Sequence, residues 1–421
     1  MDLRRKDGRR RVVVTGGGIV NPIGRDWKTI FENLKQQKNF TAYNTDWDVF
    51  ERMNTRLACA YTQPLSQYPR KKIRGMGRVA VMSLMSAEDA LKMAGLQSED
   101  GAEVSPLLQN GRTGIAYGAC MGSFPAVVDL CRMDINGDMS RIDSQTYIKA
   151  MPQTCAANLS VYYQIRGRII TTNTACTSGS QAVGYAYEAI AGGMQDIMIA
   201  GGAEELCSPS AAVFDTMGAA AWDNDRPETE PRPFDQSRNG LVLGEGAGTL
   251  VLESLESALN RGAKIYAEVA GFGTNADGTH VTNPNRETMA EALRMAISDA
   301  AISATDIGYV NAHGTATTTG DIAETNATFS VFGRAVPISS TKSYIGHTLG
   351  ACGAIEAWIS LNMMNEGWFH PTLNLSHVDE RCAPLDYIAG SGREISTEYV
   401  MSNNFAFGGM NTSLIFKKFT A

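Results

Sequence analysis

The stretch that most constrains the fold is a strand, a tight turn and a helix that follow one another over residues 169–194. It opens on two isoleucines and two threonines, whose β-branched side chains are typical of a buried strand. The helix, residues 181–194, is rich in alanine and glycine, and Val183, Tyr187 and Ile190 are spaced along one of its faces. Small residues leave little bulk between neighbouring elements, so we expect this helix to be closely packed.

A cysteine, Cys176, lies on the turn between this strand and this helix. A thiol in the first turn of a helix faces free backbone N–H groups and the positive end of the helix dipole, and both favour the thiolate. Cys176 is therefore a candidate nucleophile. A single cysteine is more often a small buried side chain without a chemical role, so this interpretation depends on other groups in the chain.

Composition narrows the class of protein. The chain has 421 residues, 43% of them hydrophobic and 19% charged, with 42 glycines, which favours a glycine-rich α/β enzyme of two domains or one large layered domain. A net charge of −7 argues against a general nucleic-acid binder, which needs a basic excess. No stretch approaches the roughly 18 apolar residues that cross a membrane. We therefore expect a soluble, cytoplasmic protein with no nucleic-acid or membrane partner.

Metal and disulfide sites are not indicated. The eight cysteines form no CxxC pair and no regular framework, and the five histidines form no HExxH motif. Glycines 16–18 invite comparison with a dinucleotide-binding turn, but Asn21 takes the place of the last glycine and a proline follows it. We expect a first strand at Val12–Thr15, a turn at these glycines and a helix at Trp27–Gln36.

Further along, residues 79–94 are expected to form a helix, and residues 134–150 are polar and expected to be irregular. The second half of the chain repeats the pattern of the first. The predicted strand at 113–118 has a counterpart at 307–312, and the strand, turn and helix around Cys176 have one at 336–364. The sequence thus predicts two similar α/β halves that share one core, which we divide at residues 1–255 and 256–421.

Two histidines occupy positions that suit chemistry. His313 follows a predicted buried strand, and His347 lies on a glycine-flanked turn before a helix. Ligands of α/β proteins gather outside the carboxyl ends of the strands, where we also place Cys176. A single histidine of this kind is more often structural. Three reactive groups at three strand ends together indicate a catalytic site.

Near the C-terminus, residues 402–411 follow a short strand and contain two phenylalanines and two adjacent glycines. Backbone N–H groups of such a turn can line an oxyanion hole, and the aromatic rings can gate an apolar channel. The simpler interpretation is a tight turn between two strands.

Six segments occur in an order that resembles the elongating β-ketoacyl-acyl-carrier-protein synthases, the condensing enzymes of fatty acid and polyketide synthesis. They are Thr174–Gly179, Arg232–Asp235, Gly244–Gly248, His313–Glu324, Lys342–Gly350 and Phe407–Gly409. The resemblance covers nearly the whole chain. It implies the α/β thiolase-like fold, a five-layer α/β/α/β/α sandwich built from two similar halves, and the decarboxylative Claisen condensation of an acyl chain with malonyl-acyl-carrier protein.

The resemblance also implies roles for single residues. Cys176 would attack the acyl thioester and hold the growing chain. His313 and His347 would hydrogen-bond the malonyl thioester carbonyl and stabilise the enolate that forms on decarboxylation. The N–H groups of Cys176 and Phe407 would form an oxyanion hole, and no metal or redox cofactor is needed.

Other implied roles concern support and specificity. Lys342 and Glu324 would form an ion pair that supports the histidines. The residues expected to contact substrate are Met121, Thr315, Thr317, Phe405 and Gly408. The chain departs from the commonest family pattern at Thr177, Ala406 and Met410, and Met121 lies in a loop that lines the family's acyl pocket. These departures put the substrate range in doubt, so a specialised synthase of an aryl polyene or aromatic polyketide pathway is an alternative.

Two partners follow from the same resemblance. An acidic carrier protein needs a local positive patch on this acidic chain, for which the candidates are Arg70, Lys71, Lys72, Arg74, Arg78 and, more weakly, Arg141. A dimer would form through the edge strand before Cys176, residues 168–173, which is β-branched. The second chain would be an identical copy or a chain-length factor.

Competing functions are weaker. A thiolase would need a second reactive cysteine near the C-terminus, but Cys382 lacks the glycines of such a site. A starter-type synthase would lack His347. A chain-length factor keeps the fold but loses the nucleophile, which the presence of Cys176 argues against. A binding module without chemistry would hold a thiol that does not react with alkylating agents at neutral pH.

Overall fold

The fold is organised around one eleven-stranded sheet in a computed structural model that describes residues 2–66 and 68–420. From edge to edge its strands are β13 (Asp386–Tyr387), β11 (Pro337–Ser339), β10 (Ile307–Asn311), β15 (Tyr399–Ala406), β16 (Met410–Lys417), β9 (Ala267–Ala276), β1 (Val12–Val20), β8 (Gly246–Ser254), β6 (Ile197–Glu204), β4 (Thr113–Gly118) and β5 (Ile169–Thr172). Two small sheets pair β12 (Trp368–Phe369) with β14 (Arg393–Glu394), and β2 (Ala42–Tyr43) with β3 (Leu57–Cys59) and β7 (Leu243–Gly244).

The helices cover both faces of this sheet. They are α1 (Trp27–Lys35), α2 (Arg78–Met93), α3 (Phe124–Asn136), α4 (Thr146–Ala150), α5 (Thr154–Tyr163), α6 (Ser178–Ala191), α7 (Ser208–Thr216), α8 (Leu255–Asn260), α9 (Arg286–Ala300), α10 (Thr318–Phe332), α11 (Lys342–Ile345) and α12 (Cys352–Glu366). None of them is long and apolar enough to cross a membrane, as far as the described residues extend.

The large sheet consists of two half-sheets with the same connectivity. Counted outward from the centre, one half runs β1, β8, β6, β4, β5 and the other runs β9, β16, β15, β10, β11. If the five strands of each half are numbered in chain order, both half-sheets have the spatial order 1-5-4-2-3 from the centre outward. Both also have the same pattern of parallel and antiparallel pairs. The antiparallel pair of β1 and β9 joins them. The expected two similar halves are confirmed, while the division at residue 255 stays a prediction.

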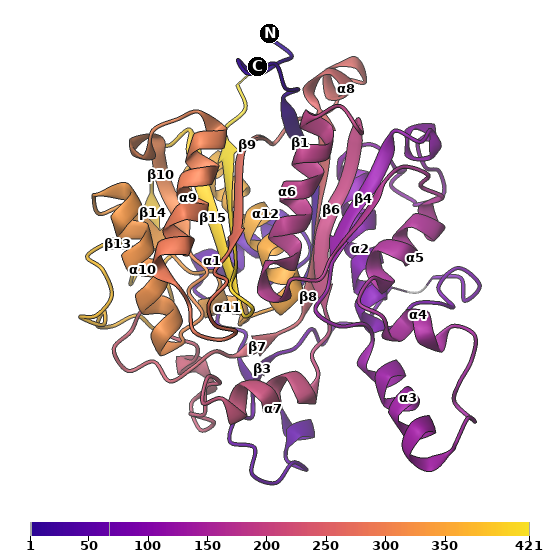
Figure 1. Ribbon diagram of the computed structural model, residues 1–421, viewed down its shortest axis with the longest axis vertical. Coiled ribbons are helices and arrows are strands. Elements are labelled where there is room, and N and C mark those ends of the chain that lie inside the picture. Colours follow the sequence, from indigo (N-terminus) through magenta and orange to yellow (C-terminus); the bar gives the residue numbers. More distant parts are fainter. Residues whose placement is uncertain (1, 67, 421) are drawn as a thin grey trace.

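Helices and half-sheets form five layers, as expected from the sequence. Figure 1 shows α6 and α12 between the two half-sheets, with α2 and α5 outside one half and α9 and α10 outside the other. On α6, the predicted apolar face of Val183, Tyr187 and Ile190 is buried. The helix packs closely: a Cβ on Gly184 would lie 2.3 Å from the ring of Phe272, so only glycine fits there.

Glycines 16–18 are not the expected turn, because they lie inside β1. A Cβ on Gly16 would lie 2.3 Å from the carbonyl oxygen of Ala90 in α2, and one on Gly17 would lie 2.3 Å from the ring of Trp358 in α12. The glycines therefore let one helix approach each face of the central strand. Local sequence suggests a turn here, but tertiary packing explains the glycines.

Two other local predictions were wrong. Residues 134–150 are not irregular throughout, since α3 extends to Asn136 and α4 begins at Thr146. The strand before Cys176 is not buried: β5 is the last strand at one edge of the sheet, and only Thr172 at its end is buried. Ile169 and Thr171 are exposed at this edge, while Ile170 packs partly buried against the core.

Candidate active site

The three predicted reactive groups lie at the ends of neighbouring elements in the centre of the molecule. Cys176 lies in a single helical turn, Ala175–Thr177, between β5 and α6. His313 directly follows β10, and His347 lies between α11 and the turn Leu349–Ala351 that precedes α12. One group comes from the first half of the chain and two come from the second.

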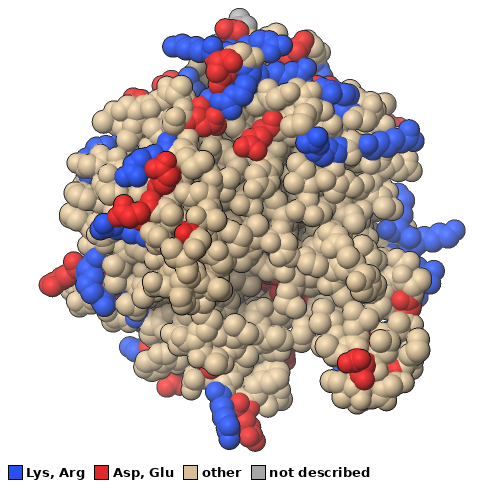
Figure 2. Space-filling view, viewed as in Figure 1, with Lys and Arg blue, Asp and Glu red and all other residues tan. Residues whose placement is uncertain are grey.

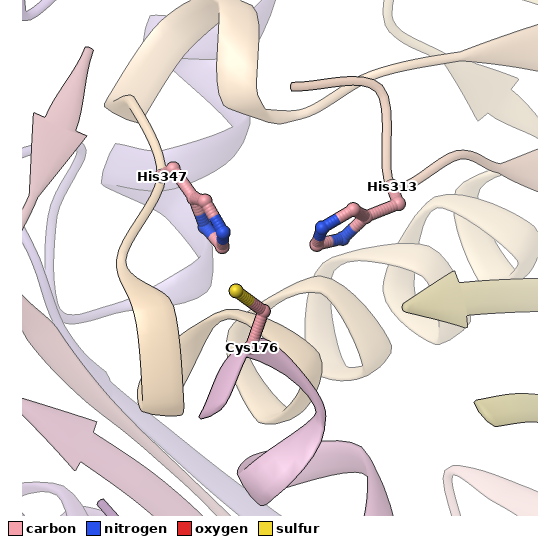
Figure 3. A group of neighbouring side chains, drawn as sticks. All are labelled: Cys176, His313 and His347. Carbon is pink, nitrogen blue, oxygen red and sulfur yellow. The ribbon is translucent and has the colours of Figure 1, made fainter. Parts of the chain in front are cut away.

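These side chains converge. The Cys176 sulfur and a ring nitrogen of each histidine all lie within 4.8 Å of one another. The imidazole centroids are 5.1 Å apart, with the ring planes at 88°. Figure 3 shows both rings pointing toward the sulfur. All three residues are buried, with exposed fractions of 5%, 7% and 2% in chain order.

Hydrogen bonds behind the rings assign their protons. Nδ1 of His347 accepts the N–H of Leu349 at 3.3 Å. The side-chain amide nitrogen of Asn404, which can only donate, lies 3.4 Å from Nδ1 of His313. With both Nδ1 atoms acting as acceptors, each neutral ring carries its proton on Nε2. The site thus holds two Nε2–H donors.

A thiolate and two imidazoles would also suit a zinc ion. Zinc binding through Nε2 requires a lone pair on that atom and a proton on Nδ1, usually held by an acceptor behind the ring. Here both histidines have donors behind the ring instead. The arrangement therefore fits stabilisation of an anion better than a metal, in agreement with the sequence-based expectation.

Burial sets the charge of each group. Desolvation, together with the nearby Lys342 cation, holds the pKa of both His313 and His347 well below the usual histidine value, so both rings are neutral. Desolvation also raises the pKa of Cys176 to about 12, against the lowering effect of Lys342. The expected thiolate is thus not the resting form, because burial outweighs the helix terminus.

The two backbone groups expected to form an oxyanion hole both lie near the Cys176 sulfur. The N–H groups of Cys176 and Phe407 both act on the Cys176 sulfur and lower its pKa. Phe407 lies in the turn between β15 and β16. Its ring packs against Phe214 of α7, with centroids 5.4 Å apart.

The expected ion pair between Lys342 and Glu324 does not form. The Lys342 ammonium pairs with Glu356 of α12, and both side chains are buried. Glu324 instead accepts the N–H groups of His313 and Gly314, each at 2.7 Å. Glu324 therefore fixes the turn that carries His313. Burial raises its pKa to about 8.

Glu356 and Asn404 were not predicted from the sequence. The Asn404 amide donates to Glu356 at 2.7 Å and reaches His313, so it links the ion pair to the histidine. The sequence signal was a glutamate within a mostly apolar stretch of α12. The sequence alone cannot show which carboxylate pairs with a buried lysine.

A narrow cavity of about 70 Å³ leads to Cys176. Its lining includes both histidines and, from the predicted substrate contacts, Thr315, Thr317 and Phe405, with Phe407 beside them. Met121 and Gly408 are not among the described residues that line it. The segment 277–284 also lines it and was missed, because it has no recognisable motif. Gly408 donates its N–H to the carbonyl of Val281 in that segment at 2.7 Å.

The predicted docking residues differ in their surroundings. Arg70, Lys71, Lys72 and Arg74 are exposed, and Lys72 stacks over the ring of Tyr162. The guanidinium of Arg78 is partly exposed and pairs at 2.7 Å with the buried carboxylate of Glu245, so its role in docking stays a prediction. Arg141 is exposed and lies 3.6 Å from Asp129.

Models of known families match both halves of the chain. The beta-ketoacyl synthase N-terminal domain matches residues 9–258, and the beta-ketoacyl synthase C-terminal domain matches residues 266–376. A curated relative, 3-oxoacyl-[acyl-carrier-protein] synthase 1 of Haemophilus influenzae, is 36% identical over 417 residues, which covers 97% of this chain and 99% of the relative.

Solved structures agree with these matches. A beta-ketoacyl synthase from Burkholderia phymatum superposes with a TM-score of 0.94 at 51% identity, covering 97% of this chain and all of the other. The ishigamide ketosynthase/chain length factor gives 0.87 at 32% identity, with 98% and 100% coverage. A type II polyketide acyl-carrier protein in complex with its ketosynthase gives 0.85 at 29%, with the same coverage.

Proposed function

The chain belongs to the beta-ketoacyl synthase family, and from that premise we propose that Cys176, His313 and His347 carry out its condensation. It is an acyltransferase of the elongating type, which joins an acyl chain to a malonyl unit on acyl-carrier protein with loss of carbon dioxide. The observation that carries the residue assignment is the pair of Nε2–H donors beside the thiol of Cys176.

In the first step the acyl group moves to Cys176. The sulfur attacks the thioester carbonyl of the acyl-carrier protein, and the N–H groups of Cys176 and Phe407 stabilise the oxyanion. The carbon–sulfur bond to the carrier breaks. The thiol proton of Cys176 leaves with the carrier sulfur, so one thioester and one thiol are exchanged for another such pair.

In the second step malonyl-carrier protein enters, and its thioester carbonyl accepts the Nε2–H groups of His313 and His347. The bond between the α-carbon and the carboxylate breaks, carbon dioxide leaves, and the electron pair forms an enolate at this carbonyl. The enolate carbon attacks the acyl carbonyl, and the bond to the Cys176 sulfur breaks. A proton from solvent restores the thiol. Neutral rings suffice for this step, because each Nε2–H donates a hydrogen bond to the oxyanion without transferring its proton.

The turn between β15 and β16 acts as a gate. A cavity of about 70 Å³ holds only about two water volumes, far less than an acyl chain. Phe407 and Ala406 both line it and precede two glycines with φ of +90° and +72°. Movement of this turn would carry the Phe407 ring off Phe214 and open the channel.

The acyl enzyme provides the test. Wild-type protein incubated with acyl-carrier protein should gain one acyl group on Cys176, seen by peptide mass spectrometry, and Cys176→Ala should neither gain it nor condense while its melting temperature is retained. Cys352, a second buried thiol whose Sγ donates to the Cys176 carbonyl at 3.2 Å, is the matched control. Cys352→Ala should still be acylated. An undiminished acyl label in Cys176→Ala would refute the assignment.

The partners are a carrier protein and a second chain. Ketosynthases in complex with a carrier protein and with a chain-length factor are known among the similar structures. For this chain, the support is the exposed basic run Arg70–Arg74 and the unpaired edge of β5. The chain-length-factor complexes also support a second candidate pathway, type II polyketide synthesis, beside fatty acid synthesis.

A further inference from the structure

A buried glutamate near the active site has no role in the proposed condensation mechanism. Glu204 is the last residue of β6 and is 3% exposed. One of its oxygens, Oε2, accepts two backbone N–H groups, from Cys120 at 2.9 Å and from Gly350 at 3.1 Å. In the part of the chain that the structure describes, backbone donors rather than a lysine or arginine face this carboxylate.

One of these hydrogen bonds leads to His347. Gly350 follows Leu349, the residue whose N–H assigns the proton of His347. Leu349 has a φ of +45°, a left-handed conformation that costs a leucine free energy and persists only when neighbours hold it. Because the N–H of Gly350 donates to Glu204, the peptide unit between Leu349 and Gly350 is fixed. The strained Leu349, whose N–H supports His347, is thereby held in place.

Gly350 also connects the carboxylate to the nucleophile. A Cβ on Gly179, three residues after Cys176, would lie 2.9 Å from the Gly350 carbonyl oxygen, and one on Gly350 would lie 2.8 Å from Oε2 of Glu204. The Glu204 carboxylate therefore lies next to the Cys176 turn, and it is negatively charged above its pKa, which burial raises to about 7. It raises the pKa of Cys176, as burial does more strongly.

We propose that Glu204 is a positioning residue with two separable effects: its Oε2 holds the Leu349–Gly350 peptide that orients His347, and its charge keeps the Cys176 thiol protonated. This inference rests on the proposed function of those two residues. The titratable groups coupled to Glu204 are the thiols of Cys120, Cys155, Cys176 and Cys207, and Lys342 is the cation that acts on the nucleophile.

Two substitutions separate these effects. Glu204→Gln removes the charge but retains an oxygen that can accept both N–H groups. Glu204→Asp retains the charge but withdraws the carboxylate by one methylene, so that the hydrogen bond to Gly350 is lengthened or lost. Glu205→Gln is the control, because this neighbour is equally buried but binds Val79 and Phe124 rather than the active-site turns.

Two measurements report on the two effects. Alkylation of Cys176 by iodoacetamide across pH 7 to 10 needs no substrate. Glu204→Gln should accelerate it roughly three- to tenfold at pH 8, because the thiolate fraction rises when the pKa of the thiol falls. Decarboxylation of malonyl-carrier protein should fall roughly tenfold or more in Glu204→Asp and change little in Glu204→Gln. Glu205→Gln should leave both profiles at wild-type values.

The outcomes are decisive. Slower or unchanged alkylation in Glu204→Gln refutes the role of the charge, and undiminished decarboxylation in Glu204→Asp refutes the positioning of His347. Equal losses of both activities in all three variants would mean that Glu204 is only structural. If wild-type protein fails to decarboxylate, the proposed function fails, while the alkylation profiles still decide the effect on Cys176.

Discussion

At the scale of single residues, burial decides which groups carry charge. Desolvation keeps the two histidines neutral and the Cys176 thiol protonated, while Lys342 and Glu356 form a charged pair beside them. Two neutral N–H donors can stabilise a developing negative charge without first breaking an ion pair of their own. The division of labour between the cysteine and the histidines follows from this arrangement.

We predict that the histidines serve the malonyl unit and not the nucleophile. His313→Ala and His347→Ala should each lower malonyl decarboxylation and condensation by about 10²- to 10³-fold, the usual effect of one lost oxyanion donor. Acylation of Cys176 should be affected less, because its oxyanion is held by backbone N–H groups. Single-turnover acylation and decarboxylation, measured separately, test this. A variant that decarboxylates normally but fails to acylate would identify that histidine as the base for Cys176.

The sequence analysis selected three residues whose side chains converge in the structure, because each lies on a turn after a strand or a short helix and beside glycine or small residues. It did not predict that Lys342 meets Glu356, because Glu324 and Glu356 are both glutamates on helices of the second half and only the packing distinguishes them. It also overestimated the effect of the helix terminus on Cys176, since burial cannot be read from one turn.

At the scale of elements, the two halves present matching turns to each other. Ala175 before Cys176 has a φ of +49°, and Leu349 before Gly350 has a φ of +45°, both unusual for residues with a Cβ. The turn of the first half carries the nucleophile, while its counterpart carries a glycine whose small size admits Glu204. The repeat was visible in the sequence, but the positive φ values were not, because neither residue is a glycine.

The edge strand β5 is predicted to pair with a second chain. Ile169→Lys places a charge on the unpaired edge and should convert a dimer to monomers at micromolar concentration. Leu259→Lys on α8 is the matched control, because both side chains are 45% exposed. Light scattering measures the mass of each. A fully active wild-type monomer at the same concentration would contradict the prediction.

The basic run before α2 is predicted to bind the carrier protein. Figure 2 shows that the middle of one face has few charged side chains, so attraction has to come from a local patch. Reversing Lys72 and Arg74 to glutamate should raise KM for carrier-bound substrate and hardly change it for a small thioester mimic. Reversal of Lys28 and Lys35 on α1, which are also exposed, should affect neither. Equal losses with both substrates would exclude a docking role.

At the scale of the whole molecule, several buried acids couple stability to pH. Desolvation raises the pKa of Glu204 and Glu230 to about 7 and that of Glu324 to about 8. In the unfolded chain these groups lose their protons near pH 4.5, so between pH 6.5 and 8 the native state holds more protons than the unfolded state. Stability should therefore fall across this window, by on the order of 3 kcal/mol if the three contributions add.

Urea unfolding at intervals from pH 6.5 to 8 measures this slope. Three buried histidines, including His370 with its pKa lowered to about 4 by burial, act in the opposite direction. Their effect is largest below pH 6.5, where the unfolded imidazole gains a proton, and offsets about 1 kcal/mol of the fall inside the window. Glu230 lies outside the catalytic cavity, so Glu230→Gln should flatten the slope without changing Cys176 acylation. A stability that rises with pH in this window would contradict the assignment.

The position of β16 has a consequence for synthesis on the ribosome. This strand, Met410–Lys417, is the last strand in the described part of the chain, yet it lies between β9 and β15 in the interior of the sheet. The half-sheet that carries both histidines therefore cannot close while β16 is still inside the exit tunnel. A nascent chain at that stage already exposes Cys176 but has no assembled donor pair, so it decarboxylates no malonyl unit.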